Sequence, residues 1–293
     1  MIRGSHIDPY EEKVAYTYED DPESWRKVLG DNLLFEWGVY DHPDSPRPVS
    51  MDEASVRFLD RQLEQAGLKS PTPPMQRILD VGCGWGYTLG YLARQFEDCV
   101  RLDGINVSRS QLEHCSRYLS AQGLTDRVSL YFCNALDIDL LPDHGVPYDL
   151  VFMRGVIDHF PPEVFASAMK ALASRVSSSG SLVISTNLYN ENLDNYQSAI
   201  PDEVDRLASG HRKTLEMVTQ MLECSGFQIA NVQEMPSAAD VAHFLLEAKS
   251  NIEAHFPEGV TGALKELRTC AINLSIAMLQ GKTSAYSIIA TRP

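Results

Sequence analysis

The sequence predicts a doubly wound, Rossmann-like α/β fold, and two observations lead to this fold class. An apolar run at residues 77–81 enters a cluster of glycines, after which apolar residues recur at helical spacing. Strand, glycine turn and helix form the opening unit of such a domain, and ligands lie at the carboxyl ends of its strands. Beyond this unit, strand-like runs alternate with amphipathic helical segments. At 293 residues, the chain suits one large domain with additions or two small domains.

The glycine cluster indicates a ligand that lies against the backbone. Residues 77–91 read RILDVGCGWGYTLGY, with Asp80 ahead of Gly82, Gly84 and Gly86. Glycine allows the sharp turn and the close approach of a ligand to main-chain N–H groups. A nicotinamide dinucleotide fingerprint, G-x-G-x-x-G, requires glycine where this chain has Tyr87. The spacing present is instead G-x-G-x-G.

This string resembles the first motif of class I S-adenosylmethionine-dependent methyltransferases. The sequence LDVGCGWG is most similar to that of the branch of cyclopropane fatty acid synthases and small-molecule, natural-product methyltransferases. The resemblance runs from about Leu33 to the end, and the carboxyl-terminal half looks more like methyltransferases of sugars and natural products such as indolocarbazole glycosides. It implies S-adenosyl-L-methionine as cofactor, S-adenosyl-L-homocysteine as product, and seven mostly parallel strands with helices on both faces and an antiparallel seventh strand.

The composition of the chain limits the kinds of partner that we expect it to bind. The net charge of −15, without a local basic patch, argues against a nucleic-acid backbone as a ligand. No apolar run reaches transmembrane length and no signal peptide opens the chain, so we expect a cytoplasmic protein without integral membrane contact. The six cysteines lie far apart without zinc-ligand spacing, which predicts reduced thiols and no metal. Residues 3–6 have the appearance of a tag relic. A homo-oligomer is left open.

The remaining strands and two helix starts follow from local patterns. Ser50–Glu53 and Ser108–Gln111 read as capping boxes that open helices. A helix is expected to start near Pro161 and Pro162. After 77–81, the expected strands lie near residues 99–105, 128–133, 148–153, 181–186, 227–232 and 285–291.

Two parts of the chain are expected outside the sheet domain. Residues 1–70 read as an N-terminal helical lid, in which Tyr10, Val14 and Tyr18 recur at helical spacing and a short helix ends at Gly30. Its stretch LLFEWGVYDHPDSP is either a packed loop or a cover over the cofactor, and the resemblance favours the cover. In the core, residues 71–293, cap segments are expected at about 187–210 and 236–280. The second cap segment carries two amphipathic helices that would form pocket walls.

The resemblance assigns the cofactor to residues after the first three strands and in the lid. The glycine turn would face its methionine part. Asn106 stands where relatives carry an acid for the ribose hydroxyls, and we favour it over Asp103, which falls inside the strand. Residues 134–136 would surround adenine, although an ordinary strand exit is the alternative. The expected cofactor-binding residues are Phe35, Asp80, Gly82, Cys83, Gly84, Gly86, Asn106, Gln111, Asn134, Ala135, Leu136 and Arg154.

The stretch RGVIDHF, residues 154–160, is the candidate catalytic segment. It follows the fourth strand and aligns with G-M-F-E-H of cyclopropane synthases, whose acid and histidine line the active site. Asp158 and His159 match that pair, and a simple helix cap is the alternative. Histidine changes charge near neutral pH, so His159 is a candidate proton acceptor.

One departure and an excess of aromatic residues shape the expected acceptor. Cyclopropane synthases carry a lid cysteine that helps to hold a bicarbonate base, and Trp37 stands at that position here. We therefore expect plain methyl transfer rather than ring closure. Aromatic faces suit a flat or isoprenoid acceptor and stabilise a carbocation. The expected acceptor-binding residues are Tyr18, Trp37, Phe160, Tyr189 and Tyr196.

The predicted activity is methylation of a small hydrophobic secondary metabolite. Carbon methylation of a prenyl or terpenoid alkene is slightly favoured. Oxygen methylation with His159 as base is the close alternative, and nitrogen methylation is third. A nicotinamide oxidoreductase and a non-catalytic cofactor-binding protein are the two alternatives from other classes.

Overall fold

The computed structural model describes residues 8–45, 49–69 and 73–293. The expected tag relic at residues 3–6 lies outside them.

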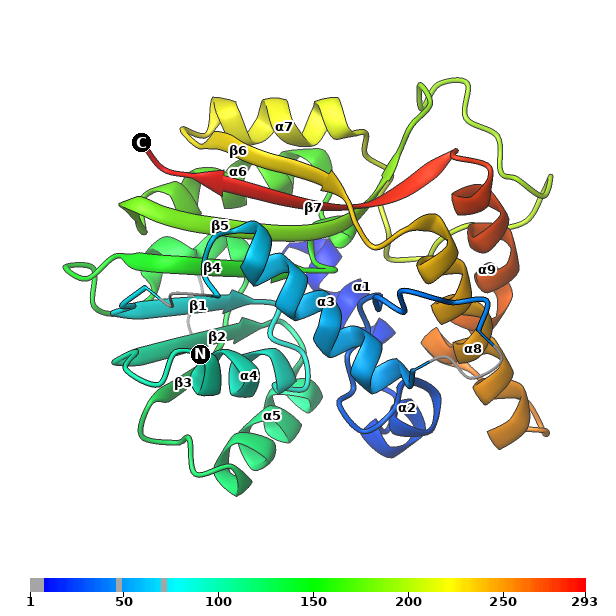
Figure 1. Ribbon diagram of the computed structural model, residues 1–293, viewed down its shortest axis with the longest axis horizontal. Coiled ribbons are helices and arrows are strands. Elements are labelled where there is room, and N and C mark those ends of the chain that lie inside the picture. Colours follow the sequence, from blue (N-terminus) through cyan, green and yellow to red (C-terminus); the bar gives the residue numbers. More distant parts are fainter. Residues whose placement is uncertain (1–7, 46–48, 70–72) are drawn as a thin grey trace.

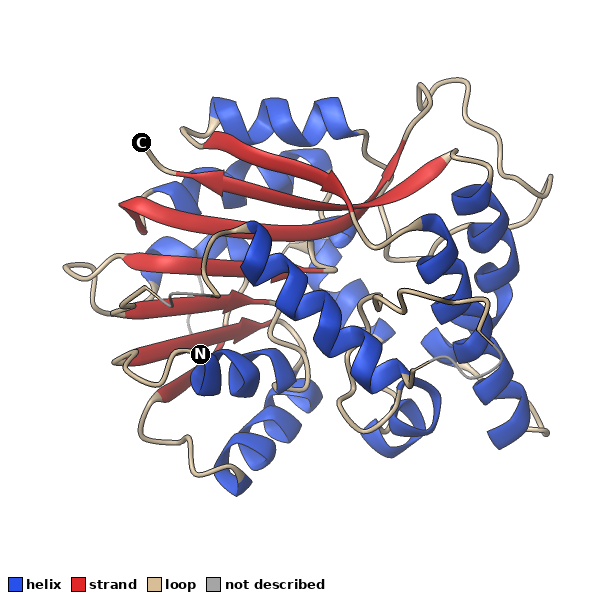
Figure 2. Ribbon diagram, viewed as in Figure 1, coloured by secondary structure: helices blue, strands red, loops and turns tan. Residues whose placement is uncertain are grey.

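Within the described residues, one seven-stranded sheet forms the centre of the fold, in the order β3-β2-β1-β4-β5-β7-β6. Only β7 runs antiparallel to its neighbours in this sheet (Figures 1 and 2). The predicted fold class and the antiparallel last strand are therefore confirmed. The strands are β1 (Arg77–Val81), β2 (Arg101–Asn106), β3 (Val128–Phe132), β4 (Tyr148–Arg154), β5 (Val176–Tyr189), β6 (Gln228–Glu234) and β7 (Thr283–Thr291).

Both faces of the sheet are covered, which explains why the central strands carry many apolar side chains. Successive side chains point to opposite faces, so Ile78 and Leu79 of β1 enter different clusters. One face packs on α3 (Met51–Gln65), α4 (Tyr87–Gln95) and α5 (Arg109–Ala121), and the other packs on η1 (Ala135–Leu140), α6 (Pro162–Ala173) and α7 (Leu215–Cys224). Strands buried on both faces need continuous apolar runs, as parallel sheets generally show.

A third apolar cluster lies beyond the carboxyl ends of the strands and joins the N-terminal segment to α8 and α9 (Figure 1). The elements in and beside it are α1 (Pro9–Thr17), α2 (Pro22–Leu29), η2 (Ile157–His159), α8 (Ala238–His255) and α9 (Gly262–Leu279). The apolar stripes predicted for the last two helices are buried, for example at Phe244 and Leu267. Tyr40 N donates to Asp240 Oδ1 over 2.9 Å and ties the lid segment to α8.

Several element boundaries differ from the sequence-based expectation. β5 extends well beyond residues 181–186 at both ends, because Tyr148 pairs with Val176 at one end and β7 pairs out to Tyr189 at the other. The two expected capping boxes are half formed. Ser50 and Ser108 cap their helices, but Glu53 binds Arg57 and Gln111 accepts from Asn106 instead of returning to the cap.

The division into a lid at 1–70 and a core at 71–293 stays a prediction. Helix α3 contributes to both parts, since Phe58 belongs to the third apolar cluster whereas Leu59 and Leu63 pack on the sheet.

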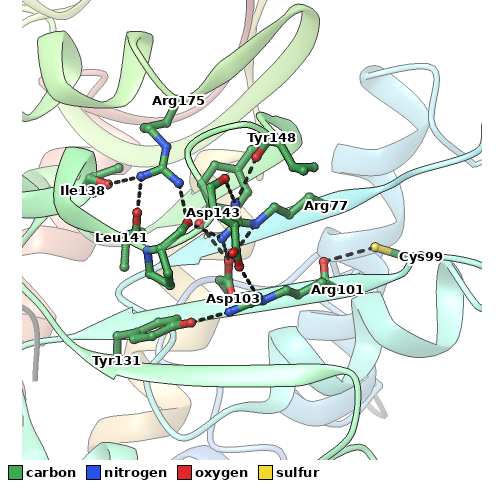
Figure 3. Close-up of polar contacts among 12 residues, drawn as sticks. Arg77, Cys99, Arg101, Asp103, Tyr131, Ile138, Leu141, Asp143, Tyr148 and Arg175 are labelled. Carbon is green, nitrogen blue, oxygen red and sulfur yellow. Dashed lines mark hydrogen bonds and ion pairs between the residues drawn. The ribbon is translucent and has the colours of Figure 1, made fainter.

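A buried ion-pair network closes the amino-terminal side of the sheet (Figure 3). Asp103 on β2 is fully buried and receives bonds from Arg77 Nη2 at 2.6 Å, Arg77 Nε at 2.9 Å and Tyr148 Oη at 2.8 Å. Arg101 Nε donates to its other oxygen at 3.0 Å. The carboxylate is thus committed to structure, as its position inside the strand predicted.

Replacing Asp103 should unfold the protein more readily without touching the carboxyl edge. We expect Asp103→Ala to lower the free energy of unfolding by about 3–5 kcal/mol, because the Arg77 guanidinium remains buried without its partner. Urea unfolding followed by circular dichroism measures this. Asp41→Ala, which removes an exposed partner of Arg57, is the control and should cost less than about 1 kcal/mol. If both variants lost the same small amount of unfolding free energy, the structural role of Asp103 would be contradicted.

Candidate active site

Two adjoining cavities lie at the carboxyl edge of the sheet. The first runs over the ends of β1, β2 and β4 and is covered by α1 and lid residues 33–36. The second lies between β5, β7, α9 and the loop at residues 205–211. Empty space in and at the mouths of the cavities amounts to about 940 and 780 Å³. The β1–β4 boundary, where the strand order reverses, is the usual ligand position in such folds.

The glycine turn leaves open space where a ligand could lie. The N–H groups of Gly82 and Cys83 both bond to the carbonyl of Ile105, at 2.9 and 3.0 Å, which fixes the turn on β2. A Cβ at Gly82 would collide with Val156, so this position is closed by packing. A Cβ at Gly84 would meet only a carbonyl oxygen at 4.0 Å, and its φ of +53° favours glycine. The open side of the turn therefore faces the first cavity.

The end of β2 carries an amide pair. Asn106 Nδ2 donates to Gln111 Oε1 over 2.9 Å, and Asn106 Oδ1 accepts from Ser108 N at 3.1 Å. Both amides line the first cavity, whereas Asp103 does not. Asn106 keeps a second N–H and a second lone pair for a ligand.

Most of the expected cofactor residues meet in this cavity. Asn134 does not line it, because its amide bonds to Tyr10 and Glu11 of α1. Leu136 packs against the core instead. Those that line the cavity are Phe35, Asp80, Gly82, Cys83, Gly84, Gly86, Asn106, Gln111, Ala135 and Arg154.

Three buried charged groups gather beside the glycine turn. Burial raises the pKa of Glu36 to about 8 and that of Asp80 to about 7, and nearby Arg154 opposes both shifts. The Arg154 guanidinium lies 5.1 Å from the Phe58 ring. Glu36 Oε1, Asp80 Oδ2 and two guanidinium nitrogens lack hydrogen-bond partners among the described residues. Such a set fits a ligand that carries both an ammonium and a carboxylate.

The two cavities share a common wall. It consists of Tyr18, Phe35, Glu36, Gly155 and His159, which line both. Side chains at this junction would contact a ligand in either cavity, so a group passing from one ligand to the other would move here.

His159 is neutral at this junction. Its Nδ1 lies 3.3 Å from the carbonyl of Ser209 and its Nε2 lies 3.1 Å from Tyr18 Oη. Because a carbonyl only accepts, Nδ1 carries the proton and Nε2 accepts from the Tyr18 hydroxyl. Burial lowers the pKa of His159 to about 4 and raises the pKa of Tyr18.

Asp158 does not pair with the His159 ring. Its Oδ1 accepts from Thr186 Oγ1 at 2.8 Å. Burial raises the pKa of Asp158, and the charge of Lys213 opposes this shift in part. The buried Lys213 has its own pKa lowered to about 8 by burial. The two expected catalytic side chains thus lie in different surroundings: His159 lines both cavities, and Asp158 lines only the second.

The expected acceptor residues divide between the cavities. Tyr18 lines both, Trp37 and Tyr189 line the second, and Phe160 lines the first. Tyr196 stands behind Tyr189, with ring centroids 4.7 Å apart, and its hydroxyl donates to Asp205 at 2.6 Å.

Sequence reasoning missed three residues of these walls. Glu36 is a lone carboxylate between Phe35 and Trp37, and that isolation within an aromatic run was an available signal. Asn187 and Thr283 line the second cavity from β5 and β7. They are almost 100 positions apart, and only the strand pairing brings them together.

Comparison with known proteins decides the family. Residues 6–270 match the model of the mycolic acid cyclopropane synthetase family. The chain belongs to this family. Methyltransferase GfsG of Streptomyces halstedii is 27% identical over 67% of this chain and 66% of its own length. Tocopherol O-methyltransferase of Arabidopsis thaliana is 26% identical over 86% of this chain and 69% of its own.

A solved structure agrees in fold. Geranyl diphosphate C-methyltransferase from Streptomyces coelicolor A3(2), in complex with S-adenosyl-L-homocysteine, superposes with a TM-score of 0.72 at 16% identity, covering 99% of this chain and 100% of the other. Together these comparisons confirm the predicted family and the cofactor, S-adenosylmethionine, and support a methyltransferase of small molecules. The glycine cradle and the unpartnered charges of the first cavity fit that cofactor.

The part of the chain that the structure describes contains neither a membrane-spanning helix nor a cluster of metal-binding side chains. No described helix has the length and apolarity needed to cross a bilayer. No three described His, Cys, Asp or Glu residues gather as a metal site would require.

Filling the open side of the glycine turn should remove cofactor binding. In Gly84→Val the new methyl groups would occupy the first cavity, so we expect the affinity for S-adenosylhomocysteine to fall at least about 100-fold in calorimetry. Gly123→Val is the control. It has a similar positive φ of +69° but open surroundings at the end of α5, so it carries the same backbone strain far from the cavity. Equal affinity in both variants would show that the turn does not hold the cofactor.

Proposed function

We propose that this protein transfers a methyl group from S-adenosylmethionine, bound in the first cavity, to a small hydrophobic acceptor bound in the second. The observation that carries the proposal is the junction of the two cavities at Tyr18, Glu36 and His159. When bound, the cofactor supplies an electrophilic methyl group. The chain's own residues hold both molecules in line and exclude water from the point of contact.

The first cavity would hold the cofactor by matching its charges. The unpartnered N–H groups of Arg154 would hold the methionine carboxylate, and the free oxygens of Asp80 and Glu36 would accept from its ammonium. Asn106 and Gln111 would bond to the ribose hydroxyls without a full charge. Ala135 would lie beside the adenine, and a contact from Asn134 or Leu136 stays a prediction.

For the acceptor we propose carbon methylation of a prenyl or terpenoid alkene. Attack by an alkene leaves a carbocation on the acceptor, and aromatic faces stabilise such a charge. Tyr18 supports this reading, because its ring lies 6.1 to 6.3 Å from the rings of Trp25, Phe35 and Trp85 around the junction. A weakly basic His159 suffices to remove a proton from a carbocation, which is a strong acid. The C-methyltransferase of geranyl diphosphate in the same fold is consistent with this chemistry.

Oxygen methylation is the second candidate. The contact between Tyr18 Oη and His159 Nε2 favours it, since this pair offers a path for a hydroxyl proton. The sequence similarity to tocopherol O-methyltransferase supports the same alternative.

Cofactor affinity should increase with pH through neutrality. Asp80, whose pKa is about 7, is neutral below that pH and charged above it, and only the charged form pairs with an ammonium. We expect the affinity for S-adenosylhomocysteine to rise about five- to tenfold between pH 6 and 7.5, measured by calorimetry. Glu36, whose pKa is about 8, would add to this rise, so the double variant Asp80→Asn, Glu36→Gln should bind weakly with a flat profile. A wild-type affinity independent of pH would argue against this role.

Removing the junction histidine distinguishes carbon from oxygen methylation. In the carbon case, His159→Ala should alter the product distribution while methyl transfer continues, because the proton leaves only after the carbocation has formed. In the oxygen case, turnover should slow about 10²–10⁴-fold with the same product.

The assay uses a panel of prenyl alcohols and phenols with S-adenosylmethionine, and mass spectrometry and NMR locate the new methyl group. His144→Ala, at an exposed loop position, is the control and should leave rate and products unchanged. A methyl group found on oxygen or nitrogen in the wild-type product would defeat the alkene proposal and leave the cofactor assignment intact.

A further inference from the structure

The wall of the second cavity formed by the sheet contains two buried polar groups that the protein leaves unsatisfied. Asn187 Oδ1 and Thr283 Oγ1 have no hydrogen-bond partner among the residues that the structure describes. Both side chains line the second cavity, and Thr283 has no exposed surface. A buried polar atom without a partner costs about 1–3 kcal/mol, so a bound molecule that satisfies these atoms gains that energy.

The two groups lie on the same face of neighbouring strands. Thr283 of β7 stands directly opposite Tyr189 of β5, and Asn187 precedes Tyr189 by two positions. Side chains two apart on a strand share a face, and diagonal neighbours across two strands are about 7–8 Å apart. One small polar group placed between Asn187 and Thr283 can therefore reach both.

Several other polar residues of this cavity are already paired, whereas Glu36 Oε1, at the junction, is not. Asp205 accepts from Tyr196, Arg206 and Arg212, and Arg206 Nε donates to the carbonyl of Gly210. Asp158 is held by Thr186. The rest of the wall is apolar, with Trp37, Leu207, Leu245, Leu267, Cys270 and Leu274.

We propose that the acceptor carries a hydroxyl group that is recognised, not methylated, by Asn187 and Thr283. A hydroxyl both donates and accepts, so it can satisfy the carbonyl oxygen of the Asn187 amide and the hydroxyl of Thr283 together. The acceptor class is then a hydroxylated hydrophobic molecule, such as a prenyl or terpenoid alcohol. This inference rests on the proposed function, because the two residues recognise an acceptor only if the second cavity binds one.

The geometry also separates the recognised hydroxyl from the methylated atom. Gly155 at the junction bonds through its N–H to the carbonyl of Ser185 at 3.0 Å. Asn187 lies two residues further along β5, and two strand residues span about 7 Å. Asn187 and Thr283 line the second cavity but not the first, so the recognised hydroxyl would be held away from the wall that the two cavities share.

Three probes of matched shape test the proposal. Geraniol can donate and accept a hydrogen bond, geranyl methyl ether only accepts, and the hydrocarbon myrcene does neither. Calorimetry on the full chain, with and without saturating S-adenosylhomocysteine, should rank them in that order, each step worth about three- to tenfold in affinity.

Two variants show which residue is responsible for each difference in affinity between the probes. Asn187→Leu should bring geraniol to the affinity of the ether, and Thr283→Val, which keeps the side-chain shape, should weaken geraniol and the ether but not myrcene. Cys270→Ala, on the α9 wall, is the control and should change all three probes by the same factor.

The outcomes separate this inference from the proposed function. Equal affinity for geraniol and myrcene in the wild type, no binding of any probe, or an alcohol preference that survives both variants would overturn the hydroxyl site. Failure of S-adenosylhomocysteine to bind would instead contradict the proposed function, and titrations without it would still report the alcohol preference. The wild-type ranking decides the question even if a variant does not fold.

Discussion

The buried indole of Trp25 is the contact on which the site depends. It has no exposed surface, and its ring lies 6.2 Å from Tyr18, 5.2 Å from Phe35 and 5.6 Å from Trp85. These three rings belong to the end of α1, the lid segment and the glycine turn. One side chain of α2 thus positions three parts of the cavity walls, and loss of a buried tryptophan typically costs about 3–5 kcal/mol.

The same cluster explains why α2 and α8, far apart in the sequence, pack together beyond the carboxyl edge of the sheet. Asn251 on α8 donates to the carbonyl of Val28 on α2 at 3.0 Å, and the apolar sides of both helices are buried together. Packed together, they close the carboxyl edge, where the parallel strands leave their last backbone groups.

The fold and the cofactor side could be predicted because their signals are local. The glycine spacing, the apolar runs and the helix starts are each read within about ten residues. Asn106, predicted to bind the ribose, lines the first cavity and Asp103 does not, and the ribose contact stays a prediction. The features that escaped prediction depend on contacts between distant residues. Asn134 turns toward α1 rather than the cavity, and Asp158 and His159, although adjacent, point to different partners. Thr283 joins the site only through the register of β5 and β7.

The separation between the sheet and the cap has a consequence for evolution. The acceptor walls at Leu245, Leu267 and Leu274 lie on α8 and α9, two helices that contribute no lining residue to the first cavity. Substitutions there reshape the second cavity without disturbing the strands that carry the glycine turn, since distant sites act nearly independently. Descendants of one ancestral gene can therefore acquire new acceptors while inheriting the cofactor site unchanged.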